Sequence, residues 1–309
     1  MSKKQHGKQL ERGRDKRRDS KFDRRTTRNR VIILVMAVLM VLSLVGAALT
    51  SAIGGAGDPP PPPEDEPVAD AGPGPCGDAP DDVPEVDSVV YDEAFDLTID
   101  TDATYVATLD TTCGDIVIEL DVDNAPIASN NLVNLAEDGY YEGVVFHRVI
   151  PGFVIQAGDP AGTGCGQEDC ANFDPDEPSF PGYTFEDELE TAETLHEQVR
   201  EDNIEQLRAA VEAEGEDFDE EVDEELLAQL PGGYPRGTVA MANAGPDTNG
   251  SQFYVAQGDP TALPGPQFTV LGTVIEGMDV VDAIAASPTD ATDRPIEAVT
   301  IRGVSIDQR

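Results

Sequence analysis

Residues 146–159, with the sequence FHRVIPGFVIQAGD, constrain the fold of this chain more than any other stretch. Two short apolar runs are separated by Pro151 and Gly152. Proline presets φ and glycine accepts positive φ, so this dipeptide favours a tight turn between two β-strands. The stretch therefore predicts two short strands joined by a turn.

One cation, Arg148, interrupts these apolar runs. A guanidinium keeps its proton in proteins and offers a planar fork of five N–H donors. In an apolar site it can hold a carbonyl or a carboxylate, and the alternative is a structural arginine that caps a strand end. The residue is thus a candidate for chemistry that needs a fixed positive donor.

A second stretch, residues 241–254 with the sequence MANAGPDTNGSQFY, places a turn-rich loop between two apolar strands. Together and in this order, the two stretches resemble the cyclophilins, the family of peptidyl-prolyl cis-trans isomerases. The resemblance extends weakly over residues 103–309, with insertions, and does not reach residues 1–100. It implies a mainly β fold, a closed eight-stranded antiparallel barrel with a capping helix over each open end, and no cofactor.

The resemblance also implies a set of site residues. Arg148 matches the family's catalytic arginine, which stabilises the twisted amide. Residues that match the proline pocket are Phe153, Val154, Tyr254, Leu263 and Phe268, and residues that match substrate-binding positions are Gln156, Ala242 and Asn243. The implied substrates are proline-containing polypeptides.

Several positions depart from the family pattern. Tyr254 stands where the family usually has phenylalanine, and Val154 stands where methionine is common. Phe268 stands where histidine or tyrosine is common, and Ala262 lies near a position where many members have tryptophan. The phenol adds a hydroxyl to an apolar slot, which could lower turnover. His147 has no serine or free cysteine evidently paired with it, so a histidine bonded to backbone is expected rather than a base.

Charge is strongly segregated along the chain. Residues 1–30 hold 13 Lys/Arg and four Asp/Glu, whereas the rest holds seven Arg and 57 Asp/Glu, so +9 and −50 give the total of −41. Residues 31–50 carry no charge and are long enough to cross a bilayer of about 30 Å. The basic flank predicts a cytoplasmic N-terminus and an extracytoplasmic acidic remainder, with a cleaved signal peptide as the alternative.

All four cysteines follow the apolar segment. An even set in an exported chain favours disulfides, and the expected pairs are Cys165 with Cys170 and Cys76 with Cys113. Zinc is the alternative for the Cys165 to Cys170 spacing, but neither His147 nor His196 completes a ligand pattern. No metal site is therefore expected.

Local patterns predict further elements. Residues 105–109 and 116–120 alternate as a hairpin, and residues 126–138 read as a helix with Asp123 or Asn124 as its cap. Residues 189–229 are acidic and helix-prone, which predicts a dispensable insert of two short helices outside the barrel. Later elements are strands near 268–274 and 296–301 and a helix at 278–286.

The predicted organisation has four parts. These are a basic cytoplasmic tail (1–30), a transmembrane signal-anchor helix (31–52), a Pro/Gly/acidic linker (53–88) and a cyclophilin-like domain (89–309) with its insert. The expected protein is a bacterial, membrane-anchored or exported isomerase, monomeric, without nucleic acid as a partner. The rival interpretation is a binding or chaperone module with little catalysis.

Overall fold

The computed structural model describes residues 76, 84–86, 89–164, 180–213, 230, 232–258, 263 and 265–309. The chain divides into two compact units. Residues 64–200 and 231–309 form the unit that carries the sheet and the candidate site. Residues 1–63 and 201–230 form the other unit, whose described part is the end of one helix and Leu230.

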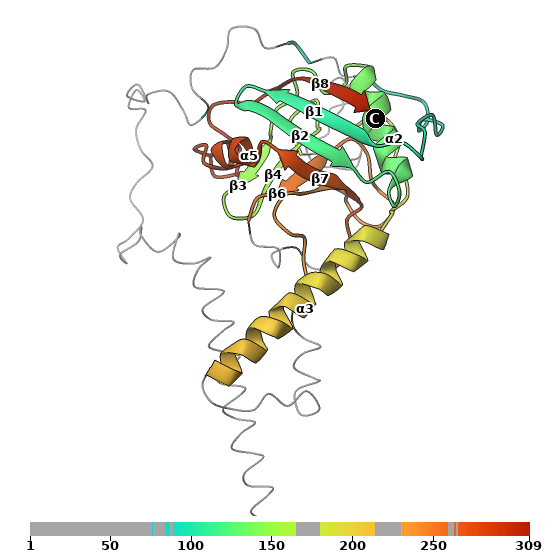
Figure 1. Cartoon of the computed structure of the whole chain (residues 1–309). Coiled ribbons are helices and arrows are strands. Elements are labelled where there is room, and N and C mark those ends of the chain that lie inside the picture. The colour runs from blue at the N-terminus through green and yellow to red at the C-terminus, as the bar shows by residue number, and fades with distance from the viewer. Residues whose placement is uncertain are drawn as a thin grey trace, which may run out of the picture. The chain divides into compact units, whose positions relative to one another are not determined.

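The core of the larger unit is one eight-stranded antiparallel sheet in the order β3-β4-β6-β5-β7-β2-β1-β8 (Figure 1). Each neighbouring pair in this order is antiparallel. The mainly β architecture predicted from the sequence is therefore confirmed. The strands are β1 (Tyr105–Thr111), β2 (Gly114–Leu120), β3 (Arg148–Ile150), β4 (Val154–Ala157), β5 (Thr238–Met241), β6 (Phe253–Ala256), β7 (Val270–Glu276) and β8 (Ile301–Gln308).

Residues 146–159 contain β3 and β4, as predicted. The turn between them includes Gly152 at φ 77°, a left-handed conformation that strongly favours glycine. The predicted hairpin also forms, because β1 pairs with β2 from Val106 opposite Glu119 to Thr111 opposite Gly114. Both strand pairs are local in sequence, so short-range signals are sufficient to specify them.

Side chains alternate across β4 and separate the core from the opposite face. Ile155 and Ala157 are fully buried in the main hydrophobic core, whereas Val154 belongs to a separate small cluster. Gln156 shares the face of Val154, because successive strand residues point to opposite sides of a sheet. This second face of β4 is where the candidate site lies.

Closure of the barrel is not shown by strand pairing. Among the described residues, β3 and β8 are the two ends of the strand order and do not pair with each other. The chain before β3 instead contacts the first residue of β8 and the chain before it. The Gly143 N–H donates to the Ile301 carbonyl at 2.8 Å, and the Phe146 N–H donates to the Val299 carbonyl at 2.9 Å. The sheet is therefore described as an eight-stranded half-barrel.

Helix α2 (Pro126–Glu137) begins at the predicted proline, but its predicted cap is wrong. The N-cap residue is Ala125, which makes no side-chain cap hydrogen bond. The carboxylate of Glu188 replaces it, since its two oxygens accept the N–H groups of Ile127 at 3.0 Å and Ala128 at 2.9 Å. These N–H groups have no partner within the helix, so a distant side chain satisfies them.

Two other helices are present in the described chain. Helix α5 (Met278–Ala285) agrees closely with the prediction and packs Val281 and Ile284 into the main core. Helix α3 (Glu190–Ala213) is one continuous helix of 24 residues, shown in yellow in Figure 1. It covers the first half of the segment predicted as two short helices, and residues 214–229 lie outside the described residues.

The prediction for the last strand is wrong. The sequence pattern predicts a strand over residues 296–301, but β8 starts at Ile301, and the Ile296 side chain is 70% exposed. Strand β8 is an edge strand that pairs along its length with β1, and its sequence is mostly polar beyond Ile301. Its weak apolar pattern explains why sequence reasoning places the strand too early.

The structure brings Cys76 and Cys113 to disulfide distance, with their Cα atoms 4.5 Å apart. The expected Cys165 and Cys170 pair lies outside the described residues, as do the predicted tail, the predicted membrane segment 31–52 and most of the predicted linker. No helix within the described residues is long and apolar enough to span a membrane.

Candidate active site

The register of four strands, β3, β4, β6 and β5, aligns the predicted residues Arg148, Gln156 and Tyr254 in one row with Ala240. Arg148 of β3 pairs with Gln156 of β4, Gln156 pairs with Tyr254 of β6, and Tyr254 pairs with Ala240 of β5. Directly opposed residues in an antiparallel sheet project to the same face, so these side chains are neighbours. Residues that are nearly a hundred positions apart in sequence therefore form one continuous surface.

Arg148 is held by two neighbours on this surface. Its Nη1 donates to Oε1 of Gln156 at 3.4 Å, and its guanidinium carbon lies 5.7 Å from the ring centre of Phe153. A cation over an aromatic face at this distance is electrostatically attracted to the ring. The arginine is half-buried, which leaves part of its donor fork accessible to a ligand.

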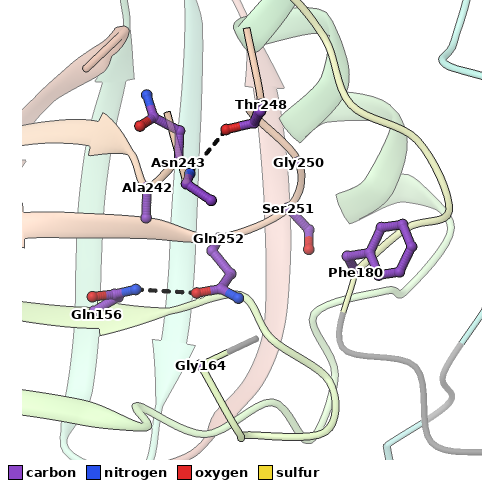
Figure 2. A pocket seen from close by; sticks show the side chains of 10 residues that line it. Gln156, Gly164, Phe180, Ala242, Asn243, Thr248, Gly250, Ser251 and Gln252 are labelled. Carbon is purple, nitrogen blue, oxygen red and sulfur yellow. Dashed lines mark hydrogen bonds between the residues drawn. The ribbon is translucent and has the colours of Figure 1, made fainter. Parts of the chain in front are cut away.

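Gln156 is oriented from its other side by Gln252. The Nε2 of Gln156 donates to Oε1 of Gln252 at 3.0 Å, and Figure 2 shows this contact as a dashed line. The Arg148, Gln156 and Gln252 side chains thus form a chain of hydrogen bonds along the surface. Such a chain fixes the direction in which Arg148 presents its remaining donors.

A cluster of apolar side chains lies beside this chain of polar residues. Val154, Ala240 and Tyr254 are buried there, and the partly buried members are Phe153, Ala242, Leu263 and Phe268. The rings of Tyr254 and Phe268 meet edge to face with their centres 5.5 Å apart. All five residues predicted to line the proline pocket are brought together, and we call this cluster the proline pocket.

The Tyr254 hydroxyl is buried and has no hydrogen-bond partner within the described part of the chain. Burial, with a smaller contribution from Tyr234, raises the pKa of Tyr254 well above its usual value. The hydroxyl is therefore neutral and points away from solvent, so the face of the pocket remains apolar. The departure from phenylalanine adds a buried polar atom behind the pocket.

A pocket of about 90 Å³, which we call the second pocket, adjoins the polar chain. It includes three predicted residues: Gln156 from β4, and Ala242 and Asn243 from the segment directly after β5 (Figure 2). Sequence reasoning misses the other lining residues, although most belong to the 241–254 stretch that carries the family resemblance. These are Gly164, Phe180, Ala244, Thr248, Gly250, Ser251 and Gln252.

The Asn243 side chain is occupied by internal hydrogen bonds. Its Nδ2 donates to the Gln267 carbonyl at 3.0 Å and to Oδ1 of Asp187 at 3.4 Å, and its Oδ1 accepts the Gly245 N–H at 3.3 Å. The side chain therefore shapes the loop. A peptide bound here would meet the main chain at Asn243 more readily than the amide.

Asp159 shapes the loop on the other side of this pocket. Its carboxylate accepts the N–H groups of Ala161 at 2.9 Å, Thr163 at 2.7 Å and Gly164 at 2.6 Å. The residue is completely buried, and this burial raises the pKa of its carboxyl group. Asp159 thus fixes the position of Gly164 at the pocket edge.

His147 differs from its prediction. The residue is buried, and neither ring nitrogen has a hydrogen-bond partner within the described residues, so the expected bond to backbone is wrong. Burial, together with the charges of Arg294 and Arg148, lowers the pKa of His147 from 6.5 to about 4. The imidazole of His147 is therefore neutral, and it packs beside Gly164.

No group of three or more His, Cys, Asp or Glu side chains in the described part of the chain is arranged to hold a metal ion. An arginine beside an apolar cluster, with a small pocket next to it, is the arrangement that the resemblance to the prolyl isomerases leads one to expect.

The chain belongs to the cyclophilin-type peptidyl-prolyl cis-trans isomerase family, whose model matches residues 106–306. It is 35% identical over 193 residues to peptidyl-prolyl cis-trans isomerase ppi1 of Schizosaccharomyces pombe. The aligned region covers 62% of this chain and 93% of that protein. It is 32% identical over 194 residues to peptidyl-prolyl cis-trans isomerase CYP18-2 of Arabidopsis thaliana, and this alignment covers 63% of this chain and 88% of that protein.

A crystal structure of a cyclophilin-type isomerase from Cryptosporidium parvum matches with a TM-score of 0.46 and 27% identity, covering 67% of this chain and 99% of that one. The relatives from Schizosaccharomyces pombe and Arabidopsis thaliana are both eukaryotic. The expectation of a bacterial, membrane-anchored form therefore stays a prediction.

Proposed function

We propose that this chain accelerates the cis-trans rotation of X-Pro bonds in polypeptides, with Arg148 as the catalytic residue. The observation that carries the proposal is the contact of Arg148 with Gln156 at 3.4 Å, directly beside the proline pocket. An always-charged donor is thus positioned next to a slot of the right chemistry for a proline ring.

The reaction requires a catalyst that prefers the twisted amide. Rotation crosses a barrier of about 18–20 kcal/mol, because the nitrogen lone pair is shared with the carbonyl. When the bond is twisted, the lone pair becomes localised on nitrogen and can accept a hydrogen bond. Arg148 would donate to this nitrogen, and each 1.36 kcal/mol of preference for the twisted form gives about a tenfold higher rate.

The neighbouring residues would hold the substrate while the bond rotates. The proline ring would enter the proline pocket, where Val154, Tyr254 and Phe268 offer apolar surface. The preceding peptide would lie along Gln156, Ala242 and Asn243 and reach the second pocket. Fixing the chain on both sides of the bond converts binding free energy into stabilisation of the twisted state.

We also propose that the protein acts outside the cytoplasm, tethered through residues 31–52 as a single-pass anchor. The supporting observations are the charge asymmetry across this segment and the pairing of Cys76 with Cys113. Clients would be exported proteins that contain proline. The extra segment 189–229 would be an acidic insertion in the family fold.

The rival function is a binding module that retains the groove without useful turnover. A protease-coupled isomerisation assay on the full chain, with a neutral prolyl peptide, separates the two. We expect turnover that disappears in Arg148→Ala, whereas peptide binding without any acceleration would support the binding module and reject the isomerase.

A further inference from the structure

The first turns of α3 pack behind the proline pocket. Ala192 of α3 and Tyr234 are buried in a cluster with Ala256 and Val270, and the partly buried members of this cluster are Leu189, Leu195, Leu263 and Phe268. Leu263 and Phe268 also belong to the proline pocket. One face of these two side chains therefore meets the pocket, and another meets residues from the acidic segment and the chain that follows it.

Tyr234 fixes the backbone that carries Phe268. Its hydroxyl oxygen accepts the N–H of Gln267 at 3.1 Å and the N–H of Phe268 at 3.0 Å. The same oxygen lies 3.4 Å from the carbonyl oxygens of Gly265 and Phe268, so it can donate its proton to one of them. A single hydroxyl thus satisfies several main-chain groups of one loop.

The Tyr234 ring also contacts both aromatic walls of the pocket. Its centre lies 6.1 Å from that of Phe268 and 6.4 Å from that of Tyr254, and it is nearly perpendicular to Tyr254. Aromatic pairs at such separations and angles are attractive. Tyr234 therefore supports the pocket through packing as well as through hydrogen bonds.

His196 of α3 holds Tyr234 from the other side. Its ring meets that of Tyr234 edge to face with the centres 4.8 Å apart. The returning chain is pressed against this contact, because a Cβ added to Gly232 would lie 2.5 Å from the His196 carbonyl oxygen and 2.7 Å from its Nδ1. The order of packing is thus His196, then Tyr234, then Phe268.

We propose that Ala192, Leu195, His196 and Tyr234, which we call the α3 buttress, position Phe268 and thereby set the size of ring that the proline pocket accepts. None of these residues is proposed to touch the substrate, so they are positioning residues that act through Phe268. The inference rests on the proposed function of the pocket. It also differs from the expectation that the whole of residues 189–229 is dispensable, since Ala192 is completely buried.

Tyr234→Phe tests the buttress because it removes the hydroxyl and keeps the ring. The probes are two peptides that differ only in the ring that follows the rotating peptide bond. One contains proline, and the other contains its six-membered homologue, pipecolic acid. Loss of one buried hydrogen-bonding group should raise KM for the prolyl peptide about fivefold while kcat changes less than about twofold. Selectivity for proline over pipecolic acid, in kcat/KM, should fall about fivefold or more.

Tyr105→Phe is the matched control. Tyr105 is buried, and its hydroxyl accepts one main-chain N–H, that of Asp100, at 3.0 Å, outside both pockets. It should lose comparable stability in thermal unfolding with no change in KM or ring selectivity. Equal effects of the two variants on KM and selectivity would overturn the proposal, since they would reduce Tyr234 to a general stability contact.

Variants of His196 provide a second test of the α3 buttress. His196→Ala should reproduce the loss of selectivity, and His196→Phe, which keeps an edge-to-face ring, should restore it. Glu197→Ala on the same helix is the control, because Glu197 is exposed and its carboxylate pairs with Arg200 at 2.6 Å. Failure of His196→Phe to recover more selectivity than His196→Ala would contradict the packing role.

Binding measurements keep this inference separate from the proposed function. If the parent chain does not accelerate isomerisation, the isomerase proposal fails, but dissociation constants of the two peptides still test the pocket. The buttress then predicts that Tyr234→Phe reduces the preference in Kd for the prolyl peptide, and Tyr105→Phe does not. Unchanged preference in Tyr234→Phe overturns the buttress whether or not the chain is active.

Discussion

Arg148 and Gln156 face each other across the β3–β4 pair, and the guanidinium donates to the glutamine oxygen at 3.4 Å. This contact joins the proposed catalytic donor to the polar chain that continues to Gln252. The strand register therefore fixes both the position and the direction of the arginine. The two residues should consequently act as a unit in catalysis.

Replacing Arg148 should remove most of the catalysis without unfolding the protein. We expect Arg148→Ala to lower kcat/KM about 100-fold, as removal of a preorganised donor commonly does. Arg148→Lys should restore little, because an ammonium lacks the planar fork. The measurement is protease-coupled isomerisation beside circular dichroism, and turnover in Arg148→Ala within about twofold of the parent would exclude this mechanism.

The coupling of Gln156 to Arg148 can be measured by a double-mutant cycle. Gln156→Leu alone should lower kcat/KM about five- to tenfold, because Arg148 loses its orienting acceptor. In the Arg148→Ala background the same change should cost less than about twofold, since no guanidinium remains to be oriented. Additive losses would mean that Gln156 acts on the substrate independently of Arg148.

His147 should make the protein less stable in mild acid. Its pKa is lowered from 6.5 to about 4 in the folded protein, so the unfolded chain binds a proton first as the pH falls. The free energy of unfolding should therefore decrease between those two values, by up to about 3 kcal/mol for this group.

Urea unfolding at pH about 7.5 and about 5 measures this effect, with His147→Leu as the comparison. The variant should lose less stability than the parent between the two pH values. His196→Phe serves as the control for the other described histidine, whose pKa is also lowered by burial. An identical pH dependence in parent and His147→Leu would show that the imidazole does not control acid stability.

Glu188 should stabilise the folded protein by as much free energy as a good helix cap does. Its carboxylate accepts two N–H groups at the start of α2, so Glu188→Ala should lower the free energy of unfolding by about 1–2 kcal/mol. Glu186→Ala, at an exposed position nearby, should change stability by less than about 0.5 kcal/mol. Chemical denaturation checks both, and equal effects would mean that the cap contributes nothing specific.

Two deletions within residues 189–229 should separate the effect of the segment's charge from its contribution to the proline pocket. Residues 201–229 hold 13 Asp/Glu and one Arg, and replacing them with a Gly-Ser linker should preserve activity on a neutral prolyl peptide. The same deletion should reduce any preference for lysine-flanked peptides, most clearly at low salt. Replacing residues 189–229 should in addition impair the prolyl peptide, because it removes Ala192 and Leu195.

Assays of both deletion variants at low and high salt give the answer. Equal activity of the two variants on the neutral peptide would argue against any contribution of residues 189–200 to the pocket. An unchanged preference for lysine-flanked peptides after deletion of residues 201–229 would leave their charge without a role in client choice.

Sequence reasoning succeeds where the deciding signals are local. The turn at Gly152, the β1–β2 hairpin and the start of α2 at Pro126 each follow from a few adjacent residues. The site residues are identified by resemblance to a family pattern, and the register then brings them together. The Arg148 and Gln156 contact needs only an eight-residue separation across one hairpin.

The remaining features depend on residues that are far apart. Glu188 caps a helix by accepting the N–H of Ile127, 61 residues earlier, which no local capping rule would find. Tyr234 meets the N–H of Phe268 across 34 residues, and nothing in the sequence marks its hydroxyl as special. The isolation of His147 from any described partner likewise arises from tertiary packing, which the strand pattern alone does not specify.

The link between Cys76 and Cys113 closes a loop of the chain over a sequence separation of 37. Both cysteines pack against the main core, and Cys113 lies in the turn between β1 and β2. A pull on the chain before Cys76 would therefore reach that turn directly through the disulfide. Tethering through this disulfide would apply load at the β1–β2 turn, which belongs to a different strand pair from the β3–β4 pair that bears Arg148.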